Sequence, residues 1–268
     1  MTAGRVFTRL VITLGLAVLQ ACAGLGGTTD DSQREPTTTS DQSDSERRAR
    51  VRMELASAYF SRGQLETALD EVKLSINAKA DLPEAYNLRG LIYAALGESG
   101  LAETSFKRAL QLNPRDGDTM HNLAWFMCQA QRFGEAEAMF GQALAQAQYK
   151  GISRTLLARG LCLARAGQWL QAEGALVRGY ELEPGNPSMA INLAEVLYRR
   201  ADYERARFYV GRVNSQPLAA NPQTLWLASR IEHKLGNLVR EREFGNELLS
   251  RFPKSPEAAL YEGKRFDE

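Results

Sequence analysis

Small and large apolar residues recur at helical spacing in the stretch of residues 122–144. Leu123 and Ala124 come before a short polar turn, and Ala136 and Phe140 follow it. Apolar positions that recur every three to four residues predict two amphipathic helices, and the short turn makes them antiparallel neighbours. One helical hairpin of this size cannot bury its apolar face alone, so we expect similar hairpins on both sides of it.

The same arrangement of small and large residues returns along most of the chain with a period of about 34 residues. The preceding copy carries Gly90, Ala102 and Phe106 at the corresponding positions, and Pro114 closes its second helix. The following copy comes two residues late, so we interpret residues 151–152 as an insertion. This rhythm resembles the tetratricopeptide repeat, a helix–turn–helix unit that stacks into a superhelix.

The resemblance predicts an all-α, right-handed superhelical solenoid of about six tetratricopeptide repeats in the part of the chain that follows residue 45. The sixth copy is degenerate, as terminal repeats often are, because one of their faces meets water. The expected domain is residues 46–268, with repeats at about 49–82, 83–116, 117–150, 153–186, 187–220 and 221–254.

Residues 1–21 have the layout of a secretory signal peptide, with two arginines, an apolar run and then Ala21 before Cys22. The apolar run, residues 10–19, is too short to span a bilayer stably. The sequence LQAC resembles the bacterial lipobox, although Gln20 stands where a small or apolar residue is usual. The resemblance implies cleavage before Cys22 and lipid modification of that cysteine. An ordinary cleaved signal followed by an incidental cysteine is the alternative interpretation.

Residues 22–45 are rich in Gly, Thr, Ser, Asp and Gln and lack large apolar residues after Leu25. A segment of this composition cannot bury enough surface to order itself, so we expect a flexible tether with a reach of roughly 25 Å. Ala23 stands where an aspartate typically retains such lipoproteins in the inner membrane. By that resemblance we expect a lipid-anchored protein at the outer membrane that faces the periplasm.

Basic and acidic residues are nearly balanced, 33 against 32, and no stripe of Lys and Arg carries interleaved aromatic residues. We therefore expect no nucleic-acid partner. The two histidines, His121 and His233, lie in different repeats, which argues against a metal site. His121 and Cys128 are seven residues apart on one predicted helix, roughly 10 Å, which is too far for a nucleophile–base pair. Since a phosphate-binding glycine loop is also lacking, we expect no enzymatic activity and no cofactor.

In tetratricopeptide repeats the first helices line a concave face, and the residues between their packing positions point into it. This mapping predicts a groove of aromatic, apolar and amide side chains, which suits an extended peptide or a helix of another protein. The predicted groove residues are Met53, Ser57, Phe60, Asn87, Leu91, His121, Asn122, Trp125, Cys128, Gln129, Leu157, Leu161, Arg165, Asn192, Glu195, Tyr198 and Arg199. For any single residue, Trp125 and Tyr198 included, packing between neighbouring repeats is an equally good interpretation.

Cys128 and Cys162 lie in the first helices of adjacent predicted repeats. Neighbouring helices of this kind are about 8–10 Å apart at their axes, so side chains that face each other could form a disulfide in an oxidising periplasm. Two buried free thiols that act as small apolar residues are the alternative.

The signal, lipobox, tether and repeats together resemble the type IV pilus biogenesis/stability lipoproteins, the PilF/PilW family of Gram-negative bacteria. The resemblance is carried mainly by two stretches, residues 121–144 and 158–187. The residues that match the pattern of the family are Asn122, Trp125, Phe126, Cys128, Arg132, Phe133, Ala136, Cys162, Gly167 and Ala172. Gln20 and Ala124 depart from it, and Ala124 stands where the family often has glycine.

The resemblance implies a pilotin, a protein that helps an outer-membrane secretin ring to reach the outer membrane and assemble into multimers. The secretin is the pore through which the pilus exits. The lipid on Cys22 would supply the location and the concave groove would bind a secretin segment, and we expect the chain to be a monomer before assembly. The alternative is a repeat scaffold lipoprotein of another envelope assembly machine, because repeat architecture alone fits either function.

Overall fold

The computed structural model describes residues 43–216 and 218–267. The predicted signal peptide, Cys22 and the greater part of the predicted tether lie outside the described residues. Within the described residues the chain forms 13 helices and no strand. This arrangement confirms the predicted all-α repeat fold. None of these helices is both long enough and apolar enough to cross a membrane.

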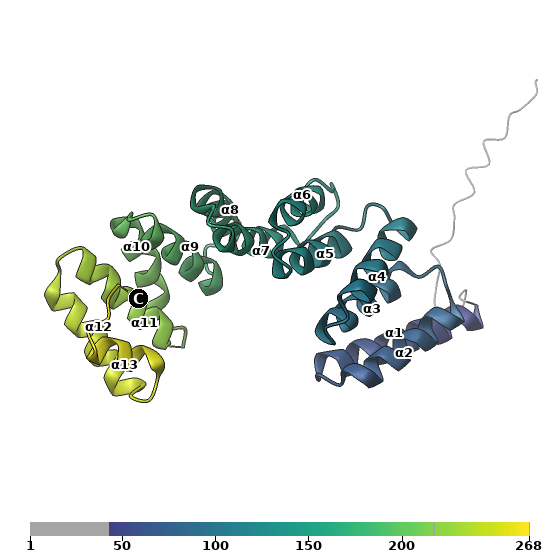
Figure 1. Ribbon diagram of the computed structural model, residues 1–268, viewed down its shortest axis with the longest axis horizontal. Helices are drawn as coiled ribbons and strands as arrows, with labels where there is room; N and C mark the ends of the chain where they lie inside the picture. Colours follow the sequence, from purple (N-terminus) through teal and green to yellow (C-terminus); the bar gives the residue numbers. More distant parts are fainter. Residues whose placement is uncertain (1–42, 217, 268) are drawn as a thin grey trace, which may run out of the picture. The chain divides into compact units, whose positions relative to one another are not determined.

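Twelve of the described helices form six successive pairs, and Figure 1 shows the pairs following one another in chain order. The pairs are α1 (Asp44–Ser61) with α2 (Leu65–Ala78), α3 (Pro83–Ala95) with α4 (Ser99–Leu112), α5 (Gly117–Gln129) with α6 (Phe133–Leu144), α7 (Ile152–Arg165) with α8 (Trp169–Leu182), α9 (Pro187–Arg199) with α10 (Tyr203–Asn214), and α11 (Pro222–Lys234) with α12 (Leu238–Arg251). A short last helix, α13 (Pro256–Glu262), follows them.

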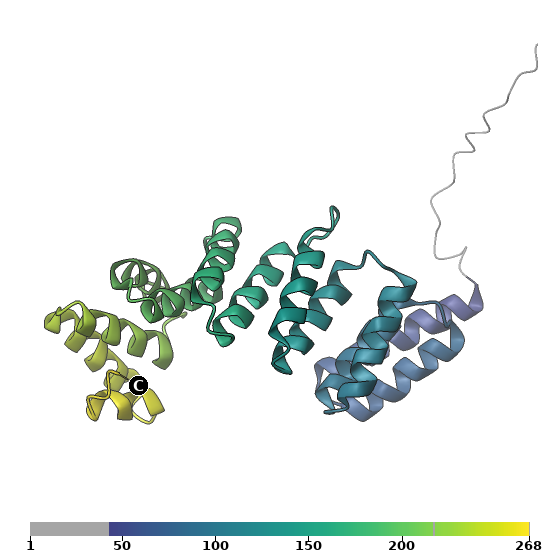
Figure 2. The ribbon, with the colours of Figure 1, turned by 45° about the horizontal axis from the view of Figure 1, so that its top comes forward.

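The first and second helices of the pairs form two layers (Figure 2). The first helix of each pair contacts the first helix of the next pair, from α1 with α3 to α9 with α11. In the described part of the chain, by contrast, no second helix contacts the second helix of the next pair. The closer spacing of the first helices makes them the inner layer of a curved array, and their free faces are available to a partner.

Helix α1 begins at Asp44, two residues before the start that we expected from the sequence. The reason is a capping box, in which the Ser43 hydroxyl accepts a hydrogen bond from the Glu46 amide and the Glu46 carboxylate accepts one from the Ser43 amide. Lys79, just after α2, also donates to Glu46 at 2.6 Å, so the same carboxylate joins the two helices of the first pair. Residues 44 and 45, which the sequence placed in the tether, therefore belong to α1.

Small residues face large ones inside each pair, as the sequence pattern predicts. Gly90 in α3 lies so close to Phe106 in α4 that a Cβ atom at Gly90 would be 2.7 Å from the ring. In the next pair Ala124 and Phe140 are both fully buried in the same hydrophobic cluster. Close packing of this kind explains why the rhythm of residue sizes is a sharper signal here than hydrophobicity alone.

All six turns within the pairs contain one residue with a positive φ angle, which favours glycine. Four of these residues are glycines, with φ between 73° and 82°. The equivalent residues in the third and fifth pairs are Gln131 and Ala201, each with φ of 60°. These two side chains hold a conformation that L-residues rarely adopt.

Replacing Ala201 or Gln131 by glycine is therefore expected to raise the free energy of unfolding by about 0.5–1 kcal/mol. Urea denaturation followed by circular dichroism measures the change. Gly97→Ala is the matched control, because its φ is 82° and a Cβ there would meet nothing within 4 Å, so only backbone strain changes. It should destabilise by a similar amount, and equal stability of all variants would refute the assignment of strain.

The end of the chain differs from the predicted domain, in which the repeats stop at residue 254. Helix α13 packs against α11 and α12, in the manner of the first helix of a further pair. Gly245 in α12 provides the room, because a Cβ atom there would overlap the ring of Tyr261. The apolar end of the sixth pair is thereby covered by Tyr261, Leu260 and Phe266.

Candidate protein-binding groove

Two adjoining hollows follow the inner faces of α7, α9 and α11, and we call them together the inner groove. The first has a volume of about 330 Å³ and is lined by Gly160, Leu161, Ala164, Arg165, Trp169, Leu176, Asn192, Glu195, Val196 and Arg199. The second, of about 350 Å³, is lined by Ile191, Asn192, Glu195, Gln223, Trp226, Leu227, Arg230 and Glu257. Asn192 and Glu195 of α9 belong to both hollows, so the surface continues from one to the other.

The first hollow combines an apolar floor with a charged rim. Gly160 and Leu176 are buried beneath it, and the half-buried Leu161 forms part of its wall. On the rim Arg199 donates to Glu195 at 2.9 Å, whereas Arg165 has no carboxylate partner among the described residues. An apolar surface with an unpaired cation beside it suits an amphipathic or acidic segment of a protein.

Trp125 extends this surface toward the third repeat. Its ring is half-buried, and the Arg165 guanidinium lies over it with 5.1 Å from the guanidinium carbon to the ring centroid. A cation over an indole ring is attracted by the negative face of the ring. One turn earlier on α5, Asn122 donates a hydrogen bond to Asn87 of α3 at 3.0 Å. Trp125 and Asn122 thus join neighbouring first helices and also remain partly accessible.

The other predicted groove residues fall into two groups. Met53, Phe60, Leu91 and Leu157 are half-buried and pack against the hydrophobic clusters, so each serves the core as well as the surface. Ser57, Gln129 and Arg165 are exposed.

Three predicted groove residues are buried rather than open, namely His121, Cys128 and Tyr198, with 8%, 1% and 7% of their surfaces exposed. The Tyr198 ring lies under the Arg230 guanidinium, and its hydroxyl donates to the Phe266 carbonyl oxygen at 3.4 Å. Phe266 follows the last predicted repeat and Arg230 lies in the degenerate sixth one, so the repeat register could not reveal this burial. The prediction that His121, Cys128 and Tyr198 present free side chains to the groove is therefore wrong.

His121 is held inside the junction of the third and fourth repeats. Its Nδ1 lies 2.9 Å from the Thr155 hydroxyl, and its ring meets the Phe140 ring at 6.0 Å between centroids. Burial, aided by the positive charge of Arg154, lowers the pKa of His121 to about 4. The imidazole is consequently neutral at neutral pH, and protonation opposes the folded state.

Acidification should destabilise the protein through His121, because the unfolded chain binds the proton near pH 6.5 and the folded chain only near pH 4. The stabilisation is present above about pH 6.5 and is lost as the pH falls toward 4, by roughly 3 kcal/mol. Urea denaturation at pH 7.5, 5.5 and 4 measures it. His121→Asn, which keeps a polar group toward Thr155, should remove most of this slope, and an unchanged slope would contradict the assignment.

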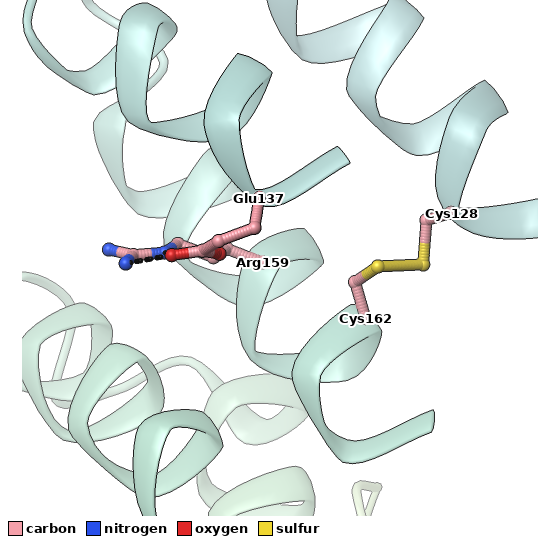
Figure 3. Close-up of a disulfide and its surroundings, with 4 residues drawn as sticks. All are labelled: Cys128, Glu137, Arg159 and Cys162. Carbon is pink, nitrogen blue, oxygen red and sulfur yellow. Dashed lines mark hydrogen bonds and ion pairs between the residues drawn. A yellow bond between two sulfur atoms is a disulfide. The ribbon is translucent and has the colours of Figure 1, made fainter. Parts of the chain in front are cut away.

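Cys128 of α5 and Cys162 of α7 are joined in a disulfide, with their Cα atoms 5.8 Å apart (Figure 3). Both residues are buried in the cluster between the third and fourth pairs. Figure 3 also shows Arg159 of α7 paired with Glu137 of α6, through hydrogen bonds of 3.0 Å from Nε to both carboxylate oxygens. The third and fourth helix pairs, between which the predicted two-residue insertion lies, are thus joined by a disulfide and by an ion pair.

Eleven residues that line the groove were not predicted from the sequence, and Trp169, Trp226, Arg230 and Glu257 are among them. Trp169 opens α8, a second helix, and the mapping considered first helices alone. Trp226 and Arg230 lie in the sixth repeat, whose degenerate pattern gave no groove positions. The signal available for Arg230 was its place four residues after Trp226, on the same face of a predicted helix.

Models of the tetratricopeptide repeat match residues 83–116, 117–145 and 157–217 of the chain. The fold, the inner layer of first helices and these matches define the class, a tetratricopeptide-repeat solenoid. Proteins of this class present the inner face to other proteins, and so the repeats indicate a role in protein interaction.

Individual proteins give a more specific comparison than the repeat models do. The chain is 23% identical over 248 residues to the type IV pilus assembly protein PilF of Pseudomonas aeruginosa, covering 92% of this chain and 97% of PilF. The crystal structure of PilW, described as a widely conserved type IV pilus biogenesis factor, matches with a TM-score of 0.73 and 26% identity over 80% of this chain and 97% of PilW. A structure of Pseudomonas aeruginosa PilF matches with a TM-score of 0.72 and 21% identity, over 83% of this chain and 100% of PilF. The chain is homologous to PilF over almost its whole length, and it shares the tetratricopeptide-repeat fold of the PilW and PilF structures.

Proposed function

We propose that the chain is a pilotin, which binds the type IV pilus secretin through the inner groove and promotes its localisation and multimerisation in the outer membrane. Homology to PilF, a type IV pilus assembly protein, supports the pathway, and the tetratricopeptide-repeat solenoid supports a role in protein binding without covalent chemistry. The secretin as the partner follows from the resemblance to the PilF/PilW lipoproteins described from the sequence.

The observation that carries the proposal is the inner groove itself. It is continuous over three first helices, and it offers the apolar Leu161 beside Arg165, a cation without a carboxylate partner in the described chain. A single secretin segment with apolar and acidic residues would bury Leu161 and neutralise Arg165 at the same time.

A second part of the proposal concerns location. Lipid modification of Cys22 would anchor the protein at the periplasmic face of the outer membrane, and several acyl chains on one residue would hold it firmly. Labelling of cells with radioactive palmitate tests this part. The label should appear in the protein and be lost in Cys22→Ser, and a labelled Cys22→Ser protein would contradict it.

The groove is tested by the double substitution Leu161→Asp and Arg165→Glu, which reverses the charge of the rim and makes the wall polar. We expect the heat-stable secretin multimers of the cell envelope to fall at least fivefold, with the helical circular dichroism of the purified protein unchanged. Gel electrophoresis of envelopes heated in detergent measures the multimers.

The matched control places the same changes on the outer layer, at Leu170→Asp and Arg178→Glu of α8. Leu170 is 66% exposed and Arg178 is also exposed, and neither lines the inner groove. The control should leave the multimers at the wild-type level. Equal multimers in both variants would refute the groove, and normal multimers in a strain that lacks the protein would move the function to a scaffold of another envelope machine.

A further inference from the structure

The last described residues of the chain turn back onto the inner face of α11. We call Gly263–Asp267 the return segment. Lys264, with φ of 55°, makes the reversal after α13, and the Arg265 amide donates to the Leu260 carbonyl oxygen at 3.0 Å. The reversal places Phe266 against the end of the inner groove, beside residues that line its second hollow.

Phe266 is recognised there as a separate ligand would be. Its ring stacks on His233 with 4.0 Å between centroids and lies 5.4 Å from the Trp226 ring. The Tyr198 hydroxyl donates to its carbonyl oxygen, and Lys234 Nζ donates to Asp267 at 2.6 Å. These contacts define a subsite, formed by Tyr198, Trp226, His233 and Lys234. It recognises three features of an extended segment, namely an aromatic ring, the backbone carbonyl of the same residue and the carboxylate of the next residue.

Arg230 adds a charge with which the return segment forms no direct ion pair. The side chain is 7% exposed, its guanidinium lies over the Tyr198 ring at 4.4 Å, and its Nε has no hydrogen-bond partner. It also lines the second hollow, and no ion pair joins it to a carboxylate in the described chain. A buried guanidinium that contacts aromatic rings but no carboxylate would attract an acidic group that enters the hollow.

We propose that the return segment is an intramolecular ligand of the groove end, and that the same subsite accepts an extended protein segment carrying an aromatic residue followed by an acidic one. This inference rests on the proposed function of the inner groove as a protein-binding surface. It does not depend on the secretin as the partner.

The return segment is held in a way that permits exchange. The Phe266 carbonyl is held by one long hydrogen bond, and the Asp267 side chain, which is 86% exposed, forms an ion pair of a kind that contributes little. The short connection to α13 compensates, because it gives the segment an effective concentration on the order of millimolar. A partner that made the same contacts and also reached Arg230 would have the means to displace it.

The test uses the helical unit, residues 43–268, with fluorophenylalanine at position 266. The ring should give a fluorine NMR signal shifted by the stacked His233 ring. Addition of the peptide YEGKRFDE, residues 261–268 of this chain, should move the signal toward the value of the free amino acid at millimolar peptide. A peptide with Phe266→Ala should have no effect, and one with Asp267→Asn should bind three- to fivefold more weakly.

A second measurement uses the unit shortened to end at Lys264. The labelled peptide should bind it at least tenfold more tightly than it binds the full unit, as read by fluorescence anisotropy. A shortened unit that keeps its helical signal and fails to bind the peptide would overturn the proposal. If the shortened unit unfolds, the fluorine experiment decides alone, and a signal that stays in place at millimolar peptide overturns the proposal. The two proposals can fail separately. If the peptide binds the subsite but the Leu161→Asp, Arg165→Glu variant keeps normal secretin multimers, the proposed function is refuted and this inference stands.

Discussion

Phe140→Ala is expected to lower the free energy of unfolding by roughly 3–5 kcal/mol and to split the unfolding of the helical unit into two steps. The side chain is among the largest that are fully buried, and its ring lies between the two helices of the third pair. The substitution leaves a cavity that the closely packed surroundings fill only in part. Urea denaturation followed by circular dichroism, and separately by tryptophan fluorescence, measures both effects.

The splitting of the unfolding transition into two steps follows from the repeat architecture. Each helix pair contacts its neighbours alone, so the pairs before and after the third one are coupled through it. Weakening this link lets the first half and the second half unfold at different urea concentrations. A comparable large-to-small substitution near the chain end should have a different effect on the transition. Leu248→Ala in α12 provides this comparison, because Leu248 is also fully buried.

Leu248→Ala should loosen α12 and α13 and leave the main transition nearly intact. A single, coincident transition for Phe140→Ala, with a loss below about 1 kcal/mol, would contradict the role of the third pair as the link between the two halves.

Loss of the Cys128–Cys162 disulfide is expected to have the second-largest effect. The cysteines are 34 residues apart in the sequence, and a cross-link over such a loop stabilises by about 3–4 kcal/mol, chiefly by restricting the unfolded chain. The helical unit of residues 43–268 lacks Cys22, so its two cysteines are those of the disulfide. Addition of a reductant should lower the urea midpoint of this unit by a corresponding amount.

The double variant Cys128→Ala and Cys162→Ala is the matched control for that experiment. It should resemble the reduced protein and should not respond to reductant. A thiol assay on the folded, oxidised unit should find no free thiol. Two reactive thiols, or a midpoint unaffected by the reductant, would show that the cysteines act as the free apolar residues of the alternative interpretation.

The parts of the fold that could be predicted are those that repeat. The fit of Gly90 to Phe106 and of Ala124 to Phe140 is local to one helix pair, so one period of sequence contains the whole signal. The positive-φ turns repeat in the same way, which places Gln131 and Ala201 at turn positions although neither is glycine.

The parts that escaped prediction depend on contacts without a period. The capping box at Ser43 moved the first helix by two residues, because a cap acts on one helix end alone. The burial of Tyr198 arises from Phe266, which is 68 residues further along the chain. A seven-residue helix such as α13 is too short to give a helical period in the sequence.

The candidate site was predictable to the extent that it follows the register. Leu161, Arg165 and Asn192 were placed on the inner face by their spacing, and the structure sets all three around the first hollow. The register could not tell an open side chain from one covered by a neighbour. His121 is an example, since its environment is set by Thr155 and Phe140, one on the next repeat and one on its own second helix.

Site-specific photocrosslinking in living cells tests the central claim most directly. A photoreactive phenylalanine analogue would replace Leu161 or Asn192 in the inner groove, and Leu170 or Arg178 on the outer layer would serve as controls. We expect covalent adducts between the secretin and the two inner positions, and none from the outer ones. Secretin adducts from the outer positions alone, or adducts from the groove to a different envelope protein and none to the secretin, would contradict the proposal that the inner groove binds the secretin.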